Sequence, residues 1–225
     1  MVRYYQVDMK VIEGWWMMKT TVSFLKSKYS CEETLKKIDK LDCDYLHVDV
    51  MDGKFVENFN FHPEDLPEIL KDVTKELDVH LMVEDPTPYI EAIKDMNVKY
   101  ITTHIELQEK HKYIDMIHSL GIGAGLAINP DTDVRRLYPY LDDIQYIIVM
   151  GVVPGKGGQK LIPETVLKII KLQQMKKDKN LDFEICIDGG VNLDTRELVD
   201  PADVIVLGSA LCMSDNYKET FNKLR

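Results

Sequence analysis

The sequence predicts an α/β fold in which eight parallel strands, each followed by a helix, close into a single-domain (β/α)8 barrel. Three observations lead to this prediction. The 225 residues fit one such barrel, which commonly spans about 200–250 residues. Short runs of apolar and β-branched residues alternate with amphipathic stretches, as expected for a parallel sheet. No G-x-G-x-x-G motif follows the first run, although a doubly wound open sheet, the alternative fold, would more often carry one.

Each element can be placed along the chain from its apolar pattern. Short apolar runs predict strands over residues 20–24, 45–50, 77–82, 100–103, 124–128, 144–150, 183–187 and 204–207. Amphipathic stretches between them predict helices over residues 32–41, 89–96, 110–120, 134–141, 163–176 and 195–199. Ser30, with Glu33 three positions later, forms a capping-box pattern that predicts the start of the first helix.

Residues 1–18 precede the first predicted strand, and we expect them to form a leader apart from the barrel at residues 19–225. They contain both tryptophans of the chain, and Met17 and Met18 offer alternative start sites. No low-complexity tract and no linker rich in Pro and Ser divides the remaining sequence. One domain is therefore expected after the leader.

The charge balance narrows the classes of partner. The chain has 28 Lys and Arg against 38 Asp and Glu, a formal charge of -10. Such a chain repels phosphate backbones and anionic lipid, so we expect neither a nucleic acid nor a membrane partner. An anionic small ligand would need a local binding site.

The four cysteines form no C-x-x-C pair, and no long apolar run or signal-peptide pattern occurs, so we expect a cytoplasmic protein.

Unusual polar residues fall at the carboxyl ends of the predicted strands, where the active sites of (β/α)8 barrels form. Side chains alternate between the two faces of a strand. His47, Asp49 and Met51 therefore share one face of their strand, and His80 and Met82 share one face of the next. Such convergence from several strands indicates a functional site more strongly than any single motif does.

His47, Asp49, His80 and Asp188 together predict a site for one divalent metal ion. Two imidazoles and two carboxylates form a mixed nitrogen and oxygen donor set, which suits Zn, Fe, Mn or Co better than Ca. A lone histidine is more often a hydrogen-bonded core residue, but four converging donors favour a metal. The carboxylates also suggest chemistry, because one can remove a carbon-bound proton while the other returns a proton to the opposite face. Alternatively, both are ligands only.

Three glycine-rich loops follow predicted strands and indicate a phosphate site. Such loops expose backbone N–H groups, which attract anions. In (β/α)8 barrels, phosphate often binds near the seventh and eighth strands. The loop residues are Gly155, Lys156, Gly157 and Gly158 after the sixth strand, Gly189 and Gly190 after the seventh, and Gly208 and Ser209 after the eighth.

Methionines and lysines near the strand ends each have two interpretations. Met51, Met82 and Met150 either fill the core or form a water-excluding lining of the site. Lys26 and Lys28 follow the first predicted strand and either reach an anionic ligand or remain solvated.

Four histidines lie outside the predicted metal set. His104 follows the fourth predicted strand and either borders the site or supports a ligand from behind. His62, His111 and His118 fall in predicted helices or loops, and we expect them at the surface.

At these residues, from about position 21 onward, the chain resembles the ribulose-phosphate 3-epimerase family. The segments that carry the resemblance are HVDVMDGKFV at 47–56, DVHLMV at 78–83, GLAINP at 125–130, VMGVVPGKGGQ at 149–159, IDGGV at 187–191 and GSA at 208–210. The resemblance implies a TIM barrel and a metal-dependent isomerase of the pentose phosphate pathway. It implies interconversion of D-ribulose 5-phosphate and D-xylulose 5-phosphate through a 2,3-enediolate.

The resemblance also implies roles for individual residues. His47, Asp49, His80 and Asp188 match the metal ligands of the family, with Asp49 as proton acceptor and Asp188 as proton donor. Ser23 matches a serine that contacts substrate, and His80 is also expected beside the substrate. The site lining and the phosphate and substrate loops match Met51, Met82, Met150, Gly155, Lys156, Gly157, Gly158, Gly189, Gly190, Gly208 and Ser209.

The chain departs from the family pattern beside the expected substrate. The family usually has Ser or Asn, Asp, Pro, Thr, a polar residue and Phe where this chain has Lys26, Lys28, Glu57, Gly151, Val153 and Lys156. The expected partner is a phosphorylated ketose, and a homo-oligomer is possible. Three alternatives stay open: a D-allulose 6-phosphate 3-epimerase, a non-catalytic barrel that binds phosphosugars, and another phosphate-binding barrel enzyme such as a lyase or synthase. The last often uses a lysine on an inner strand, and the predicted inner positions carry none.

Overall fold

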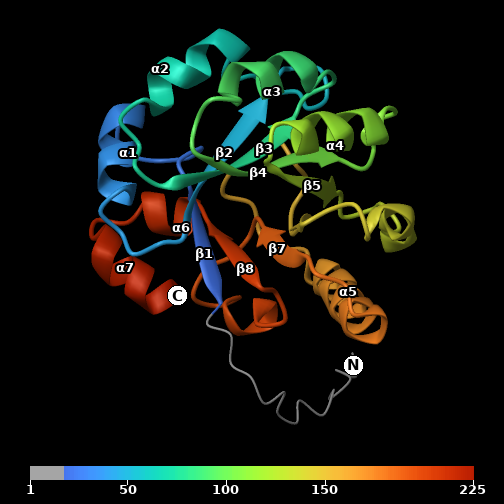
Figure 1. The fold of residues 1–225 in the computed structure, drawn as a ribbon. Coiled ribbons are helices and arrows are strands. Elements are labelled where there is room, and N and C mark those ends of the chain that lie inside the picture. The colour runs from blue at the N-terminus through green and yellow to red at the C-terminus, as the bar shows by residue number, and fades with distance from the viewer. Residues whose placement is uncertain (1–17) are drawn as a thin grey trace.

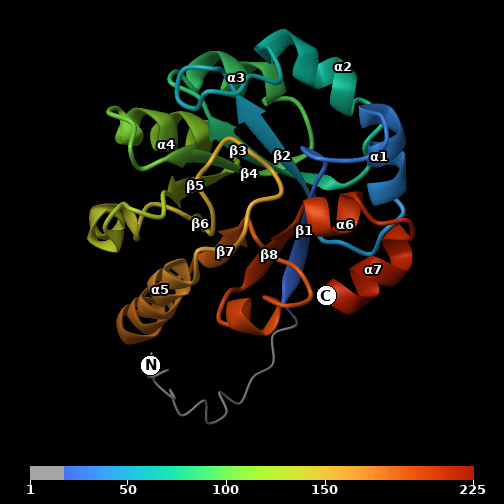
Figure 2. The ribbon, with the colours of Figure 1, turned by 180° about the vertical axis from the view of Figure 1, so that it is seen from behind.

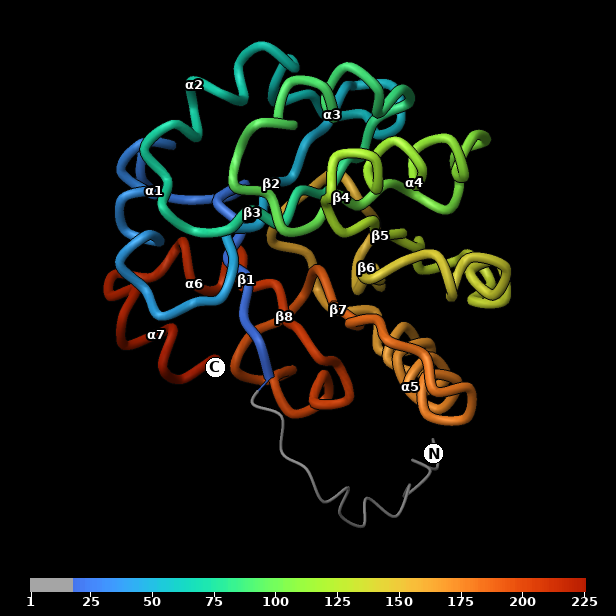
Figure 3. Tube along the Cα trace, in the orientation of Figure 1, coloured from blue at the N-terminus to red at the C-terminus, as the bar shows by residue number. Residues whose placement is uncertain are grey.

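Eight parallel strands form a closed barrel with helices on its outside in the computed structural model, which describes residues 18–225 (Figure 1). The predicted TIM barrel is confirmed. Each strand pairs with its neighbours in chain order, and β8 pairs with β1 to close the sheet, as the Cα trace shows (Figure 3). The strands are β1 Lys19–Ser23, β2 Tyr45–Met51, β3 Glu76–Met82, β4 Val98–His104, β5 Gly123–Ile128, β6 Tyr146–Met150, β7 Glu184–Asp188 and β8 Val204–Leu207.

Helices surround the barrel in both views (Figures 1 and 2). The α-helices are α1 Cys31–Ile38, α2 Leu66–Leu70, α3 Thr87–Ile93, α4 Lys110–Ser119, α5 Val166–Lys179, α6 Ser209–Cys212 and α7 Tyr217–Leu224. Four segments are 3-10 helices: η1 Pro63–Asp65, η2 Val134–Tyr140, η3 Pro163–Thr165 and η4 Glu197–Val199. Within residues 18–225, no helix has the length and apolar character needed to cross a membrane. The expected leader lies outside the described residues, apart from Met18.

The helical elements differ from the sequence prediction more than the strands do. The stretch predicted at 134–141 is the 3-10 helix Val134–Tyr140, which contains Pro139. Proline in a helix interior removes one backbone hydrogen bond and its ring clashes with the preceding turn, which disfavours a regular α-helix over this stretch. Helices α2 and α7 were not predicted. Helix α2 has only five residues, whereas α7 has eight, and its buried Tyr217, Phe221 and Leu224 follow a helical spacing that could have identified it.

The capping box predicted for α1 forms only in part. Ser30 Oγ accepts a hydrogen bond from the Glu33 backbone N–H at 3.2 Å, so Ser30 is the N-cap. The Glu33 carboxylate instead pairs with Lys37 one turn along the helix at 3.7 Å. The start of α1 is therefore fixed by Ser30 alone.

Alternation along β2 separates the two cores of the barrel. Leu46, Val48 and Val50 point outward into the large apolar core between strands and helices. Tyr45 and Met51 point inward, to two smaller clusters inside the barrel. The outward faces supply most of the hydrophobic stabilisation, which leaves the inward positions near the barrel mouth available for polar side chains.

A column of aromatic and polar side chains fills the barrel below its mouth. The Tyr100 and Tyr146 rings stack with centroids 4.3 Å apart. The Tyr146 hydroxyl donates to Asp78 Oδ2 at 3.2 Å, and the Tyr100 hydroxyl donates to Glu184 at 3.3 Å. Glu184 also pairs with Lys19 at the amino end of the barrel. The polar tips of these buried rings are thus satisfied, and the column forms a packed floor under the mouth.

Burial divides the four cysteines into one accessible and three protected thiols. Cys31 is exposed, whereas Cys43, Cys186 and Cys212 are buried. Burial raises the pKa of the Cys43 thiol to about 11, and that of Cys212 to about 11 as well. The reactive thiolate is therefore scarce at these sites at neutral pH.

We expect one fast-reacting thiol in the native protein and all four in denaturant, measured with a chromogenic disulfide reagent. Cys31→Ser should abolish the fast phase; a fast phase that survives it would contradict the buried placement of the other three.

Candidate active site

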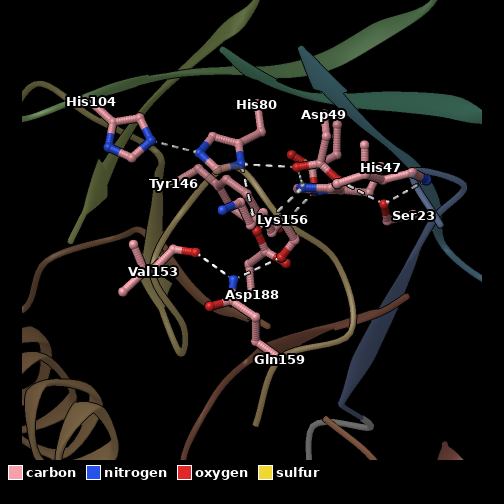
Figure 4. A network of polar contacts seen from close by, with 12 residues as sticks. Ser23, His47, Asp49, His80, His104, Tyr146, Val153, Lys156, Gln159 and Asp188 are labelled. Carbon is pink, nitrogen blue, oxygen red and sulfur yellow. Dashed lines mark hydrogen bonds and ion pairs between the residues drawn. The ribbon is translucent and has the colours of Figure 1, made fainter. Parts of the chain in front are cut away.

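The register of three strands brings two imidazoles and two carboxylates together at the carboxyl end of the barrel. His47 and Asp49 come from β2, His80 from β3 and Asp188 from the end of β7. Asp49 lies opposite His80 in the pairing of β2 with β3. One donor atom from each residue lies within 4.8 Å of all the others, and Figure 4 shows the four side chains turned toward one another. We refer to these four residues as the donor cluster.

The distances identify which atom of each side chain faces the common centre. His47 Nε2 and His80 Nδ1 each lie 3.3 Å from Asp49 Oδ1. The same two nitrogens lie 3.9 Å and 3.6 Å from Asp188 Oδ2. Both imidazoles are fully buried, while the Asp49 and Asp188 side chains are 5% and 13% exposed. The two carboxylates therefore border the open side of the cluster, and the imidazoles lie behind them.

The outward atoms of His47 and Asp49 are each held by a hydrogen bond. His47 Nδ1 lies 2.7 Å from Asp78 Oδ2, and a proton on Nδ1 leaves the Nε2 lone pair facing the centre. Asp49 Oδ2 accepts a hydrogen bond from Ser23 Oγ at 2.7 Å. Asn60 fixes the end of β2, since its amide donates to the Asp49 carbonyl and accepts from the Met51 N–H, both at 2.8 Å.

His80 is supported by a chain of hydrogen bonds that leads away from the centre. His80 Nε2 lies 2.9 Å from His104 Nε2, and His104 Nδ1 lies 3.1 Å from Glu106 Oε2 (Figure 4 shows the two imidazoles). Glu106 Oε1 accepts from Thr132 Oγ1 at 2.6 Å and from the Asn129 N–H at 3.1 Å. Because the Glu106 carboxylate accepts, His104 donates from Nδ1 and accepts at Nε2. This network assigns the His80 proton to Nε2 and turns the Nδ1 lone pair toward the centre.

The electrostatics of the donor cluster favour positive charge between the carboxylates. Burial lowers the pKa of His47, but Asp78 and Asp49 outweigh burial and raise that pKa well above its ordinary value. Burial likewise raises the pKa of Asp49, yet His47 and His80 reverse the effect and hold it below the usual range. In contrast, burial lowers the pKa of His104 to about 4, which keeps this imidazole neutral.

The donor set fits one divalent metal ion. His47 Nε2 is buried and has no hydrogen-bond partner among residues 18–225, as expected for a nitrogen that faces a metal site. Two imidazoles, which release a proton when they bind a metal, and two carboxylates supply four ligand atoms around one point. The second polar atom of His47, Asp49 and His80 is held by a neighbouring side chain, and Asp188 lies at the end of β7. Hydrogen bonds of this kind usually orient metal ligands. The donor cluster can therefore hold such an ion.

A cavity of about 460 Å³ opens above the donor cluster and gathers most of the predicted site residues. Its wall includes Ser23, Asp49, Met82, Met150, Gly155, Lys156, Gly157, Gly158, Asp188, Gly189, Gly190, Gly208 and Ser209. His47 and His80 lie behind this wall. Met51 also lies outside it and packs with Val56 and Met82 in a buried cluster, so for Met51 the structure favours the core interpretation.

Glycine is required where the loop after β7 passes the loop after β6. A Cβ atom at Gly190 would lie 2.4 Å from the Leu161 backbone nitrogen, and the φ angle of Gly190 is +77°. Both facts exclude other residues without a shift of the backbone. The close packing of these two loops shapes the wall of the cavity.

Sequence reasoning missed several residues that support the donor cluster. Asp78 has the same parity as His80 and Met82 on one strand, so strand alternation alone could have identified it. Glu106, Thr132 and Asn60 lie in loops, where no periodic pattern signals their direction. His62, His111 and His118 are exposed, as predicted.

The contact between Asp78 and His47 predicts a role in metal affinity. Asp78→Asn keeps the side-chain volume but removes the charge that makes the His47 imidazole more basic. We expect affinity for a divalent ion to fall about ten- to a hundredfold, as is typical for such supporting residues. Competition with a chromophoric chelator measures this directly. Asp115→Asn, at an exposed position of α4, is the matched control and should bind as the wild type does. Equal affinity in all three proteins would refute the role.

Comparison with known proteins places this geometry in a family. The family model described as "Ribulose-phosphate 3 epimerase family" matches residues 20–212. The chain is 35% identical to the ribulose-phosphate 3-epimerase of Bacillus subtilis over 215 residues, which cover 93% of this chain and 99% of the relative. It is 37% identical to that of Synechocystis over 198 residues, 86% of each chain. The phosphoribosyl anthranilate isomerase structure from Thermococcus kodakaraensis shares the fold alone, with a TM-score of 0.61, 12% identity and coverage of 92% and 96%. The chain belongs to the ribulose-phosphate 3-epimerase family.

Proposed function

We propose that this protein epimerises D-ribulose 5-phosphate to D-xylulose 5-phosphate at C3, with the donor cluster holding one Zn, Fe, Mn or Co ion. The observation that carries the proposal is the placement of Asp49 and Asp188. Both border the cavity, from strands that are not neighbours in the barrel, and both belong to the donor cluster. The relatives from Bacillus subtilis and Synechocystis carry the name of this activity and support the choice of substrate.

The two carboxylates can invert a carbon centre placed between them. Asp49 is ionised, because its pKa lies below the usual range, so it can accept the proton from C3 of the substrate. The electron pair of the C3–H bond then forms the 2,3-enediolate. Asp188 supplies a proton to the opposite face of C3. The bound ion would supply positive charge beside the substrate oxygens, which stabilises the enediolate.

Neighbouring side chains prepare this proton transfer. The hydrogen bond from Ser23 to Asp49 Oδ2 fixes the carboxylate that accepts the proton, so Ser23 lies where it can also contact the substrate. Met82 and Met150 present thioether side chains to the cavity and exclude water from the reacting carbon. The three glycine-rich loops border the same cavity and can bind the phosphate through backbone N–H groups.

Solvent isotope exchange tests the reaction. In heavy water, the metal-loaded protein should incorporate deuterium at C3 of ribulose 5-phosphate while xylulose 5-phosphate accumulates, both followed by NMR. D-allulose 6-phosphate assayed in parallel distinguishes the sister activity. A protein that binds ribulose 5-phosphate without exchange or product would be a non-catalytic barrel, and the proposed function would be wrong.

The assignment of roles to Asp49 and Asp188 predicts a difference between two half-reactions. Asp188→Asn should still exchange the C3 proton of ribulose 5-phosphate, since Asp49 remains, but epimerisation should fall by about 10²–10⁴-fold. Asp49→Asn should lose exchange from ribulose 5-phosphate by a similar factor. Metal content, measured on each purified variant, separates loss of the ion from loss of the proton carrier. If Asp188→Asn forms product at the wild-type rate with full metal content, the assignment fails.

A further inference from the structure

We infer that Lys26 is a specificity-determining residue whose ammonium group binds the phosphate of the substrate, an inference that rests on the proposed function. Lys26 follows β1 and borders the cavity together with Ser23 and the loop after β6. The ammonium group of Lys26 therefore brings a positive charge to the wall of this cavity.

The stem of Lys26 lies along two glycines of the loop after β6. A Cβ atom added to Gly157 would lie 3.0 Å from Lys26 Cβ, and one added to Gly158 would lie 2.6 Å from Lys26 Nζ. A side chain at residue 158 would thus displace the ammonium group. Gly158 also has a φ angle of +80°, which favours glycine. The loop and the lysine fit each other, and the fit places the charge on the wall of the cavity.

The ammonium group has no competing partner in the described part of the chain. No carboxylate among residues 18–225 forms an ion pair with Lys26, whereas Lys28 pairs with Asp215 and lies outside the cavity wall. The backbone N–H groups of Gly157 and Gly158 likewise donate no hydrogen bond within those residues. A free cation and two free N–H donors on one stretch of wall form a site for an anion with several acceptor oxygens, such as a phosphate.

The charges of the cavity also orient the substrate. Asp49 and Asp188 lie at the reacting end and repel an anionic group, while Lys26, Lys156 and Lys160 line other parts of the same wall. Lys156 pairs with Glu57 at 3.6 Å, which partly neutralises it. In a chain with a net charge of -10, Lys26 thus supplies local positive charge for the phosphate end of a ketose phosphate.

Two matched substitutions test the inference. Lys26→Met keeps the methylene stem over the glycines and removes the charge, and Lys28→Met does the same at the neighbouring lysine outside the cavity. We expect Lys26→Met to raise the KM for ribulose 5-phosphate about tenfold, the value of one hydrogen bond to a charged group, with little change in kcat. The inhibition constant of inorganic phosphate should rise by a similar factor. Lys28→Met should match the wild type, and Lys26→Arg should retain most of the affinity.

Two outcomes separate this inference from the proposed function. If wild type and Lys26→Met turn over ribulose 5-phosphate with the same KM and the same inhibition by phosphate, Lys26 does not bind the phosphate. If the wild type turns over no ribulose 5-phosphate, the proposed function fails, and calorimetry with inorganic phosphate still compares the two proteins. In that measurement, a dissociation constant about tenfold higher for Lys26→Met supports the site, and equal constants overturn it.

Discussion

The burial of two carboxylates and two imidazoles around one point is the constraint on which the rest of the site depends. Ionisable groups removed from water are stable only when their remaining polar atoms have partners, and removal of one partner from a buried pair costs roughly 3–5 kcal/mol. Here the second atom of His47 is held by Asp78, and that of Asp49 by Ser23. His80 is held by a chain that begins at His104. The barrel mouth is therefore a continuous polar network, and its inner atoms are left free for a cation.

This network continues into the interior of the barrel, which explains why aromatic and charged side chains fill the space below the mouth. Asp78 accepts hydrogen bonds from His47 and from Tyr146, so one carboxylate joins the donor cluster to the aromatic column below. Tyr146 stacks on Tyr100, and the Tyr100 hydroxyl donates to Glu184 at the other end of the barrel. Aliphatic residues alone could not supply the donors that Asp78 requires. The positions of the donor cluster and the packing of the inner core are thus parts of one arrangement.

The sequence predicted the strands and the donor cluster because both follow from local rules. Alternation placed His47 and Asp49 on the inner face of β2, and all eight strands lie within a few residues of their predicted bounds. The supporting residues depend on tertiary contacts between distant loops, such as Glu106 with Thr132, and no pattern in one segment reveals them. The inward direction of Asp78 was predictable, because the alternation that revealed His80 applies to it equally. Its contact with Tyr146 was not, because the two residues lie 68 positions apart.

The reacting end and the substrate end of the cavity are built from different parts of the fold. The donor cluster stands on strands whose register fixes it, whereas Lys26 and Gly158 belong to loops after β1 and β6. A change in these loops can alter the wall of the cavity without moving the two carboxylates of the donor cluster. The sequence resemblance implies departures from the family pattern in such loops and a match to the family's metal ligands in the donor cluster. The barrel thus keeps its chemistry fixed by strand pairing, and the loops remain free to adjust which sugar phosphate enters and how tightly it binds.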